Sequence, residues 1–469
     1  MRPRMRGPAI PPIEVEQPKM KIAVTPQQKA QRVRKTLSVC PVCLKRIDAE
    51  VVKRGDDYYI EKRCPDHGRF RAVVWRGDAP SYEEWGAGYA PPAADKNSLP
   101  ACPDGCGLCE GHLQKTCCAL VEVTTRCDLG CPVCFAQSGS CEEGGEDPTI
   151  TELRDIFNRL ATAGNTFVQL SGGEPTIRDD LPEIIAAAKE AGCETIQLNT
   201  NGIRLGRDPQ YAGELREAGL SFVFMQFDGT EDGIYEKLRG RPLLDVKKAA
   251  IANCSRALLG VTLVPTLVPG VNSHNIGEII SFAIAGSPAV RGVHFQPISY
   301  FGRYPRSEGE PGRITLPELL RDIEFQTKGK LKVKDFAPSS CDHPYCGFHG
   351  DFAILPNDMI LRLTKKNASC CPPTGDEHLK NRRFVSRRWN RESATEEIGA
   401  TGAESEPDMN DMGAFLSRIK SHGFTITAMA FQDAYTLDIE RLRRCSLHVI
   451  KDGKTLPFCS AYLTALPYN

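Results

Sequence analysis

Three cysteines in one short stretch have the spacing to hold a metal cluster. Cys127, Cys131 and Cys134 follow an apolar run, residues 119–123, that is typical of a β-strand. Their thiolates can therefore converge from one loop at the carboxyl end of that strand. A [4Fe-4S] cluster accepts four thiolates, so a loop with three leaves one iron open to bind another molecule. The spacing predicts a reactive cluster, and the alternative is a zinc knuckle that takes its fourth ligand from elsewhere.

A Gly-Gly-Glu-Pro sequence follows one predicted strand and helix later. Gly172 and Gly173 have no Cβ, so their backbone can approach a ligand closely, and Glu174 adds a hydrogen-bond acceptor beside them. The strand expected at residues 167–170 carries this loop at its carboxyl end. The loop is therefore a candidate binding site next to the three cysteines.

The next two strands also end in polar residues. Asn199 and Asn201 follow one of them, and Asp228 follows the other. We interpret them as candidate cofactor contacts, although Asn-Gly and Asp-Gly pairs form turns for purely local reasons. His294 lies within a later strand, where an interior histidine is favoured over a proton donor.

These motifs need a scaffold that brings strand ends together. Six strand-and-helix units are expected between residues 119 and 330, and they predict an α/β fold with a partial (β/α)6 barrel. Right-handed crossovers place the carboxyl ends of parallel strands on one rim, where such barrels have their sites. The cysteine and glycine loops are expected on that rim.

Eight cysteines precede residue 119. Cys40 and Cys43, with Cys64 and with His67 as a further candidate, have the spacing of a rubredoxin-like or zinc-ribbon-like site for one tetrahedral ion, zinc or iron. The remaining candidate ligands of this region are Cys102, Cys106, Cys109 and Cys117, the last paired with Cys118. Their division between one ion and one cluster stays open, because Cys40 and Cys43 could also pair with Cys106 and Cys109. The region is expected either to be structural or to pass electrons to the reactive cluster.

Four further cysteines follow the barrel. Cys341, Cys346, Cys445 and Cys459 are enough to saturate a second [4Fe-4S] cluster, which predicts an auxiliary cluster. Cys370 and Cys371 are alternative ligands. The other thiols, Cys141, Cys193 and Cys254, are expected in the core.

Composition sets broad limits on the protein. The 469 residues contain 59 Lys and Arg and 59 Asp and Glu, so no overall field selects nucleic acid, and no nucleic-acid partner is expected. Twenty cysteines grouped as metal ligands favour a reducing compartment, the cytoplasm. No run of about 18 apolar residues is present, so any membrane contact is expected to be peripheral.

The cysteine spacing, with Phe135 after the last cysteine, resembles the signature of the radical S-adenosylmethionine (SAM) superfamily. That resemblance implies a catalytic [4Fe-4S] cluster that binds SAM and cleaves it to a 5'-deoxyadenosyl radical. It also implies that Gly173 and Glu174 contact SAM, and that Asn272 contacts its adenine or ribose. A low-potential electron donor of the ferredoxin or flavodoxin type is expected as a partner.

Segments 38–365 and 425–462 look like the archaeal tetraether lipid synthases and their relatives. This second resemblance implies a radical SAM core, two auxiliary [4Fe-4S] clusters and a rubredoxin-like site. The expected parts of the chain are a disordered basic arm at 1–36, a metal and cluster domain at 37–118, the radical SAM core at 119–330, and an auxiliary-cluster domain at 331–469 with a mobile loop at about 375–412.

Three functions compete. The favoured hypothesis is a radical enzyme that abstracts hydrogen from an unactivated carbon of a lipid alkyl chain for carbon–carbon bond formation. The second is radical modification of a peptide or a small cofactor precursor, and the third is a metal-binding or electron-carrier protein without turnover. The Gly-Gly-Glu-Pro loop beside an open three-cysteine site disfavours a carrier.

Residues 380–391 form a basic segment that would suit a membrane surface. They include six Lys and Arg with two aromatics, Phe384 and Trp389. We hypothesise that this segment docks the barrel on the inner face of an anionic membrane, with a solvated loop or an RNA contact as alternatives.

Overall fold

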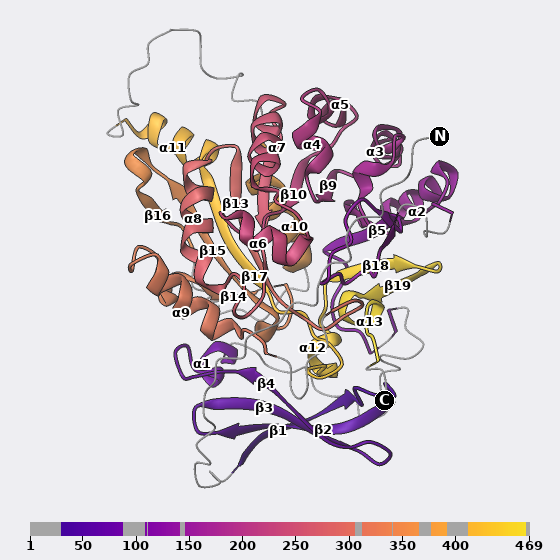
Figure 1. Cartoon of the computed structure of the whole chain (residues 1–469), viewed down its shortest axis with the longest axis vertical. Helices are drawn as coiled ribbons and strands as arrows, with labels where there is room; N and C mark the ends of the chain where they lie inside the picture. Colours follow the sequence, from indigo (N-terminus) through magenta and orange to yellow (C-terminus); the bar gives the residue numbers. More distant parts are fainter. Residues whose placement is uncertain are drawn as a thin grey trace.

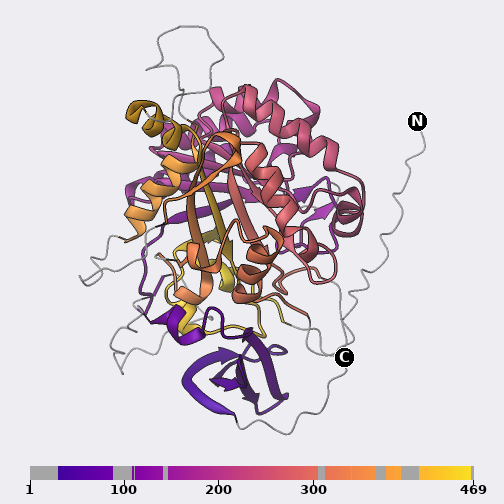
Figure 2. The same cartoon turned by 90° about the vertical axis from the view of Figure 1, so that its left-hand side faces the viewer.

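The computed structural model describes residues 30–87, 108–109, 111–140, 146–304, 312–339, 341–364, 377–391 and 411–465. An open barrel forms most of the molecule, and a small antiparallel sheet from the start of the chain packs below it (Figure 1). Figure 2 shows the same two parts from the side, with the small sheet again at one end of the barrel.

Four strands form the small sheet, which we call the ribbon. They pair in chain order as β1 (Gln31–Val39), β2 (Arg46–Arg54), β3 (Asp57–Cys64) and β4 (Gly68–Trp75), and the short helix α1 (Tyr82–Gly86) follows. The disordered arm predicted at 1–36 is wrong for its last residues, because 31–36 form most of β1. The strand pairs with β2 along its length, and the hydroxyls of Thr36 and Ser38 donate to Asp438 and to the Leu437 carbonyl, which holds the strand in place.

Six parallel strands form the barrel core, as predicted. In sheet order they are β13 (Val290–Pro297), β11 (Gly260–Val264), β10 (Phe222–Gln226), β9 (Thr195–Thr200), β8 (Phe167–Gly172) and β5 (Cys118–Thr124). Buried aliphatic and aromatic residues fill the layer between these strands and the outer helices. The core-covering helices are α2 (Ile150–Thr162), α3 (Leu181–Glu190), α4 (Ile203–Arg207), α5 (Tyr211–Glu217), α6 (Asp232–Arg239), α7 (Leu244–Arg256), α8 (Ile276–Ala285) and α9 (Leu316–Gln326).

Local sequence explains where these helices begin. The Thr149 hydroxyl accepts a hydrogen bond from the backbone N–H of Glu152, and the Glu152 carboxylate accepts one from the backbone N–H of Thr149. This capping box satisfies amide groups that the first turn of α2 would otherwise leave unpaired. Thr315 and Glu318 make the same arrangement at α9.

The C-terminal part of the chain extends the barrel sheet at both ends. On one side β17 (Gly423–Met429) runs parallel to β13, and β15 (Gly347–Ile354) runs antiparallel to β17. On the other side β18 (Leu447–Lys451) pairs in parallel with β5. The boundary expected at residue 330 therefore does not coincide with a break in the sheet. The remaining elements are β6 (Arg126–Cys127), β7 (Gly139–Ser140), β12 (Thr266–Leu267), β14 (Ala337–Pro338), β16 (Ile360–Arg362), β19 (Lys454–Pro457), α11 (Met412–Ser421), α12 (Ile439–Leu442) and α13 (Phe458–Ala461).

Residues 377–389 form helix α10 (Glu377–Trp389), so the prediction of a mobile loop at about 375–412 is wrong for this segment. The helix crosses the end of the barrel where the parallel strands begin, and its Arg382, with Arg391 just after the helix, donates to carbonyl groups there. Arg382 donates to the carbonyls of Thr116 and Gly164, and Arg388 forms an ion pair with Asp351 at 2.8 Å. Arg382 thus supplies hydrogen-bond donors to backbone carbonyls near the strand ends that would otherwise be unpaired.

The same helix contradicts the membrane-docking hypothesis for residues 380–391. Trp389 is 8% exposed, packs against Phe222 and Phe224, and donates its indole N–H to Thr425. A side chain buried in this way does not reach a membrane surface. Among the residues that the structure describes, no helix is both long enough and apolar enough to cross a bilayer.

Candidate functional site

A cavity of about 2140 Å³ fills the barrel. At the carboxyl ends of the strands it is lined by Cys127, Cys131 and Cys134, together with the loop from Gly172 to Glu174. At the opposite end it reaches Phe384 and other residues of α10. The structure therefore brings both predicted motifs to one rim of a single cavity.

The cysteine loop is held from outside by another loop. Cys134 exchanges two backbone hydrogen bonds with Arg303, at 2.8 and 3.0 Å, and the Arg303 side chain donates to the carbonyl of Cys131. The backbone N–H of Leu129 donates to the Cys127 sulfur at 3.4 Å, while burial raises the pKa of the Cys127 thiol. The loop is thus ordered by its own protein contacts. Three thiols on one rim fit a cluster that keeps one iron for another ligand.

The glycine loop packs directly on the cysteine loop. The N–H of Gly173 donates to the carbonyl of Thr124 at 2.8 Å, and the N–H of Glu174 donates to that of Arg126 at 2.9 Å. A Cβ on Gly172 would lie 2.1 Å from the Thr124 oxygen, and one on Gly173 would lie 2.0 Å from the Arg126 oxygen. These glycines are therefore required by contact between two loops, a reason additional to the close approach of a ligand that the sequence predicted.

Glu174 is 2% exposed, and burial raises the pKa of its carboxyl. One oxygen accepts hydrogen bonds from the backbone and hydroxyl of Thr176 and from the hydroxyl of Thr200. The other accepts from the backbone of Asn201 at 2.6 Å. Both oxygens therefore bind the protein itself, and Glu174 joins the glycine loop to the end of β9. Direct contact of its side chain with SAM stays a prediction.

Asn199 and Asn201 line the cavity, as expected for residues at this rim. Asn201 donates to Asp128 at 2.7 Å, which joins β9 to the cysteine loop. Asn199 donates to Ser171 at 3.3 Å. Both asparagines connect neighbouring loops of the rim.

Asp228 and Asn272 do not line this cavity, in contrast to the role expected for them. Asp228 is fully buried and forms two bonds with Arg239, at 2.7 and 2.8 Å. Asn272 donates to the carbonyls of Asp228 and Thr266. Their position behind the rim corrects the prediction of cofactor contact, because strand ends supply structural turns as well as sites.

Sequence reasoning missed two buried basic residues behind the rim, Arg239 and Lys247. Arg239 comes from α6, is 7% exposed, and lies against Cys131 as well as Asp228. Lys247 comes from α7, is fully buried, and donates to the Asn201 carbonyl, and burial lowers its pKa to about 8. Neither residue belongs to a motif, and no helix was expected over residues 232–239, so no local signal distinguished Arg239.

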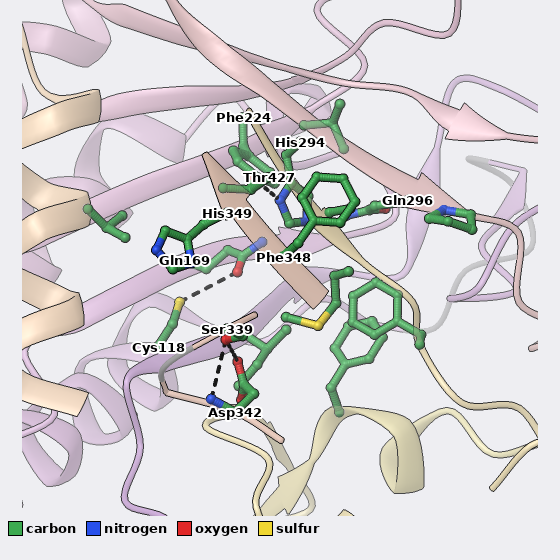
Figure 3. Close-up of a pocket in the computed structure, with 18 of the residues that line it drawn as sticks. Cys118, Gln169, Phe224, His294, Gln296, Ser339, Asp342, Phe348, His349 and Thr427 are labelled. Atoms are coloured by element: carbon green, nitrogen blue, oxygen red, sulfur yellow. Dashed lines mark hydrogen bonds between the residues drawn. The ribbon is translucent and has the colours of Figure 1, made fainter. Parts of the chain in front are cut away.

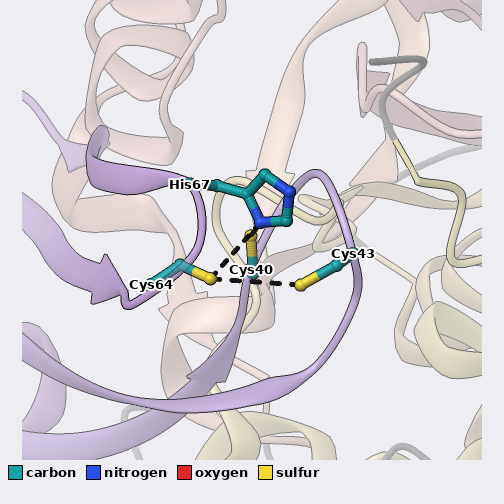
Figure 4. Close-up of side chains that lie close together, drawn as sticks. All are labelled: Cys40, Cys43, Cys64 and His67. Carbon is teal, nitrogen blue, oxygen red and sulfur yellow. Dashed lines mark hydrogen bonds between the residues drawn. The ribbon is translucent and has the colours of Figure 1, made fainter.

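The ribbon holds a separate metal site. Cys40, Cys43, Cys64 and His67 offer ligand atoms that all lie within 4.8 Å of one another. Figure 4 shows the three sulfurs around the His67 ring, whose Nδ1 lies 3.6 Å from Cys40 and 3.4 Å from Cys64. Three thiols and one imidazole suit a single tetrahedral ion. The structure thus places His67, a further candidate in the sequence, among the possible ligands of this site.

The C-terminal cysteines divide into two places. Cys346, Cys445 and Cys459 line one small cavity beside Arg441. Cys341 instead contacts Cys117 and donates to Ser446 at 3.1 Å. The predicted set of four is therefore not brought together, because Gln114 donates to the Cys341 carbonyl and Cys341 lies beside Cys117.

Cys109 and Cys445 both pack against the hydrophobic cluster that contains Cys459. Cys193 and Cys254 are buried in the core. Five cysteines lie outside the described residues: Cys102, Cys106, Cys141, Cys370 and Cys371.

Comparison with known proteins matches two segments to described families. Residues 121–283 match the radical SAM superfamily, and residues 32–76 match the HMPTM N-terminal zinc ribbon domain. The first range covers the barrel from β5 into α8, and the second covers the four strands of the ribbon. The radical SAM resemblance noted in the sequence is confirmed.

One relative spans nearly the whole chain. The 7,8-dihydro-6-hydroxymethylpterin dimethyltransferase of Methanocaldococcus jannaschii is 32% identical, over 91% of this chain and 93% of its own length. Fe-coproporphyrin III synthase of Methanosarcina barkeri is 30% identical over 48% of this chain and 56% of its own. PqqA peptide cyclase of Bradyrhizobium diazoefficiens is 33% identical over 47% and 57%.

The (β/α)6 barrel, the superfamily match and the relatives agree on one chemistry. The protein is an enzyme of the radical SAM type, and its cofactors are a [4Fe-4S] cluster and SAM, with an additional metal in the ribbon. The chain belongs to the radical SAM superfamily, in the family that includes the 7,8-dihydro-6-hydroxymethylpterin dimethyltransferase of Methanocaldococcus jannaschii.

Proposed function

We propose that this enzyme modifies a reduced pterin, a heterocyclic cofactor precursor, by radical chemistry. The end-to-end similarity to a pterin dimethyltransferase carries this proposal, since it includes the ribbon as well as the barrel. It favours the second of the alternatives drawn from the sequence, modification of a cofactor precursor, over a lipid alkyl chain. The resemblance to tetraether lipid synthases stays a prediction.

The residues of the rim have distinct roles in this proposal. Cys127, Cys131 and Cys134 hold the cluster, and the loop from Gly172 to Glu174 orients SAM beside it. When bound, these cofactors supply a 5'-deoxyadenosyl radical that can abstract hydrogen from carbon. The protein keeps that chemistry inside the barrel, because α10 closes the end of the cavity opposite the rim.

Two sites outside the barrel complete the proposal. Cys40, Cys43, Cys64 and His67 hold one zinc or iron ion that orders the ribbon. Cys346, Cys445 and Cys459 contribute to an auxiliary cluster, for which Cys109, packed against the same hydrophobic cluster as Cys445, is a candidate fourth ligand. The buried Arg441 beside this trio would offset the negative charge of the thiolates.

The test uses anaerobically reconstituted full-length protein with SAM, a low-potential reductant and 7,8-dihydro-6-hydroxymethylpterin. We expect 5'-deoxyadenosine to form, and we expect mass spectrometry to show a pterin that has gained carbon. Abundant 5'-deoxyadenosine with unchanged pterin, together with an altered lipid profile in producing cells, would contradict the proposal and restore the alkyl-chain hypothesis.

A further inference from the structure

The barrel cavity is larger than a site for SAM requires. Pockets for small molecules usually enclose about 300–1,000 Å³. The cavity of about 2140 Å³ continues from the cysteine rim to α10, where Phe384, Val385 and Trp389 line its floor. A second ligand therefore has room below the rim.

Strand register places a belt of polar side chains at mid-depth in this cavity. Gln169 on β8 is directly opposite Gln197 on β9, and His294 on β13 is directly opposite Thr427 on β17. All four line the cavity. Figure 3 shows Gln169, His294 and Thr427 turned toward the same space. We call these four residues the belt.

The belt has hydrogen-bonding atoms without protein partners. Gln169 is 8% exposed and accepts from the Cys118 thiol through Oε1, while its Nε2 has no partner among the described residues. Gln197 is 2% exposed and donates through Nε2 to Asn199, while its Oε1 likewise has no partner in the described part of the chain. Buried amides are normally paired, so a donor and an acceptor are available here for a ligand or for water.

Imidazole and phenyl rings adjoin these amides. The His294 Nδ1 lies 2.7 Å from the Thr427 hydroxyl, which leaves Nε2 as its second polar atom. The His294 ring lies 5.1 Å from that of Phe224, and Phe224 in turn contacts Trp389. Burial lowers the pKa of His294 to about 4, so the belt carries no charge at neutral pH.

These features select one kind of ligand. An alkyl chain would leave the free atoms of Gln169 and Gln197 unpaired, and an anion would find no positive charge in the belt. A planar ring with a neutral lactam edge offers a carbonyl to the Gln169 nitrogen and an N–H to the Gln197 oxygen. Its faces would meet the aromatic surface of Phe224.

We propose that the belt is the substrate subsite and that Gln169 and Gln197 bind the lactam edge of a neutral planar heterocycle. The inference rests on the proposed function, in which that heterocycle is a reduced pterin. It adds the position of the substrate, below the rim and between SAM and α10, and the residues that determine its specificity.

The test compares ligand binding in three variants of the full-length protein with its metals in place. Gln169→Met and Gln197→Met remove the amides and keep the side-chain length, and Gln210→Leu changes an exposed glutamine as the control. We measure anaerobic binding of 7,8-dihydro-6-hydroxymethylpterin and of guanine, a second lactam heterocycle. SAM cleavage without substrate and metal content serve as measures of an intact fold.

We expect each belt variant to bind the pterin about tenfold more weakly than the wild type, with SAM cleavage retained. The control is expected to bind like the wild type. Equal binding by the wild type and both belt variants would overturn the subsite and leave the proposed function standing. Wild-type binding of guanine but not of the pterin, with loss in both belt variants, would keep the subsite and overturn the pterin proposal. Binding of neither compound by the wild type would overturn the subsite.

Discussion

The ribbon and the barrel rim both gather cysteines, but they hold them differently. The ribbon takes all four ligands of its metal from residues 40–67, and these ligand atoms lie within 4.8 Å of one another. The rim takes three thiols from residues 127–134 and faces a large cavity. The ribbon site is therefore complete in itself, whereas the rim site leaves room for a ligand.

The difference lies in what supports each site. Two turns of one small sheet position the ribbon ligands. The rim depends on contacts from other parts of the molecule: Arg239, Asn201 and Arg303 reach the cysteine loop from three separate segments. An open metal site thus needs a rigid surround, because its own ligands do not complete it.

The largest effect is expected from removing the rim thiols, a change that should affect the rim site and leave the ribbon site intact. Replacing Cys127, Cys131 and Cys134 with alanine should remove about four irons and abolish 5'-deoxyadenosine formation, because no thiolate remains for the cluster. The ribbon metal should stay. Elemental analysis and chromatography of the SAM products measure both effects.

The buried Cys193→Ala is the control, since this thiol packs in the core away from the rim. SAM cleavage that persists in the triple variant would show that the cluster is held elsewhere.

The next largest effect removes support behind the rim. Asp228→Asn leaves the buried Arg239 without its counter-charge and should lower the free energy of unfolding by about 3–5 kcal/mol. Iron should be lost from the rim more readily than metal from the ribbon. Denaturant unfolding and metal analysis are the measurements, with the exposed Asp245→Asn as the control. Equal stability of both variants would mean that the ion pair does not brace the rim.

Glu174→Gln probes the link between the glycine loop and β9. The amide places a donor where the protein already presents donors from Thr176, Thr200 and Asn201, so we expect a loss of about 2–3 kcal/mol in stability. SAM affinity should fall while iron is retained, because the loop that orients SAM loses its anchor. Equilibrium dialysis with SAM measures this, with the exposed Glu190→Gln as the control. Unchanged affinity would assign Glu174 to turn structure alone.

The smallest effect concerns the contact between ribbon and barrel. Burial alone would raise the pKa of Asp438, but Arg34 and Thr36 of the ribbon outweigh it and lower the pKa from 3.8 to about 2. The resulting stabilisation, about 2 kcal/mol, is present above pH 4 and is lost as the pH falls toward 2. Asp438→Asn should therefore lower stability by about that amount at pH 7.

Unfolding measured from pH 7 to pH 2 tests the sign of this contribution. The gap between wild type and Asp438→Asn should close on acidification, whereas the exposed Glu50→Gln should follow the wild type throughout. A gap that stays constant with pH would show that the carboxylate charge does not hold the ribbon.

Local spacing was sufficient for the ligand motifs and for the barrel units. The cysteines of the rim, the ribbon ligands and the strand before each loop were predicted because each depends on residues close together in the chain. A strand followed by a turn determines where its next few side chains lie, whatever the rest of the fold does. This is why the cysteine motif and the barrel units could be predicted from the sequence, and why the motif resembles that of the radical SAM superfamily.

Only the tertiary structure decided how distant segments meet. Helix α10 has the composition of a surface loop, yet its arginines find carbonyls at the strand ends and its Trp389 fills the barrel floor. Cys341 meets Cys117 across more than 200 residues of chain, a contact that no local pattern encodes. For the same reason, Asp228 and Asn272, which were predicted to contact a cofactor, instead support the protein behind the rim. The partners of a polar residue depend on which elements the fold brings beside it, and local spacing does not contain that information.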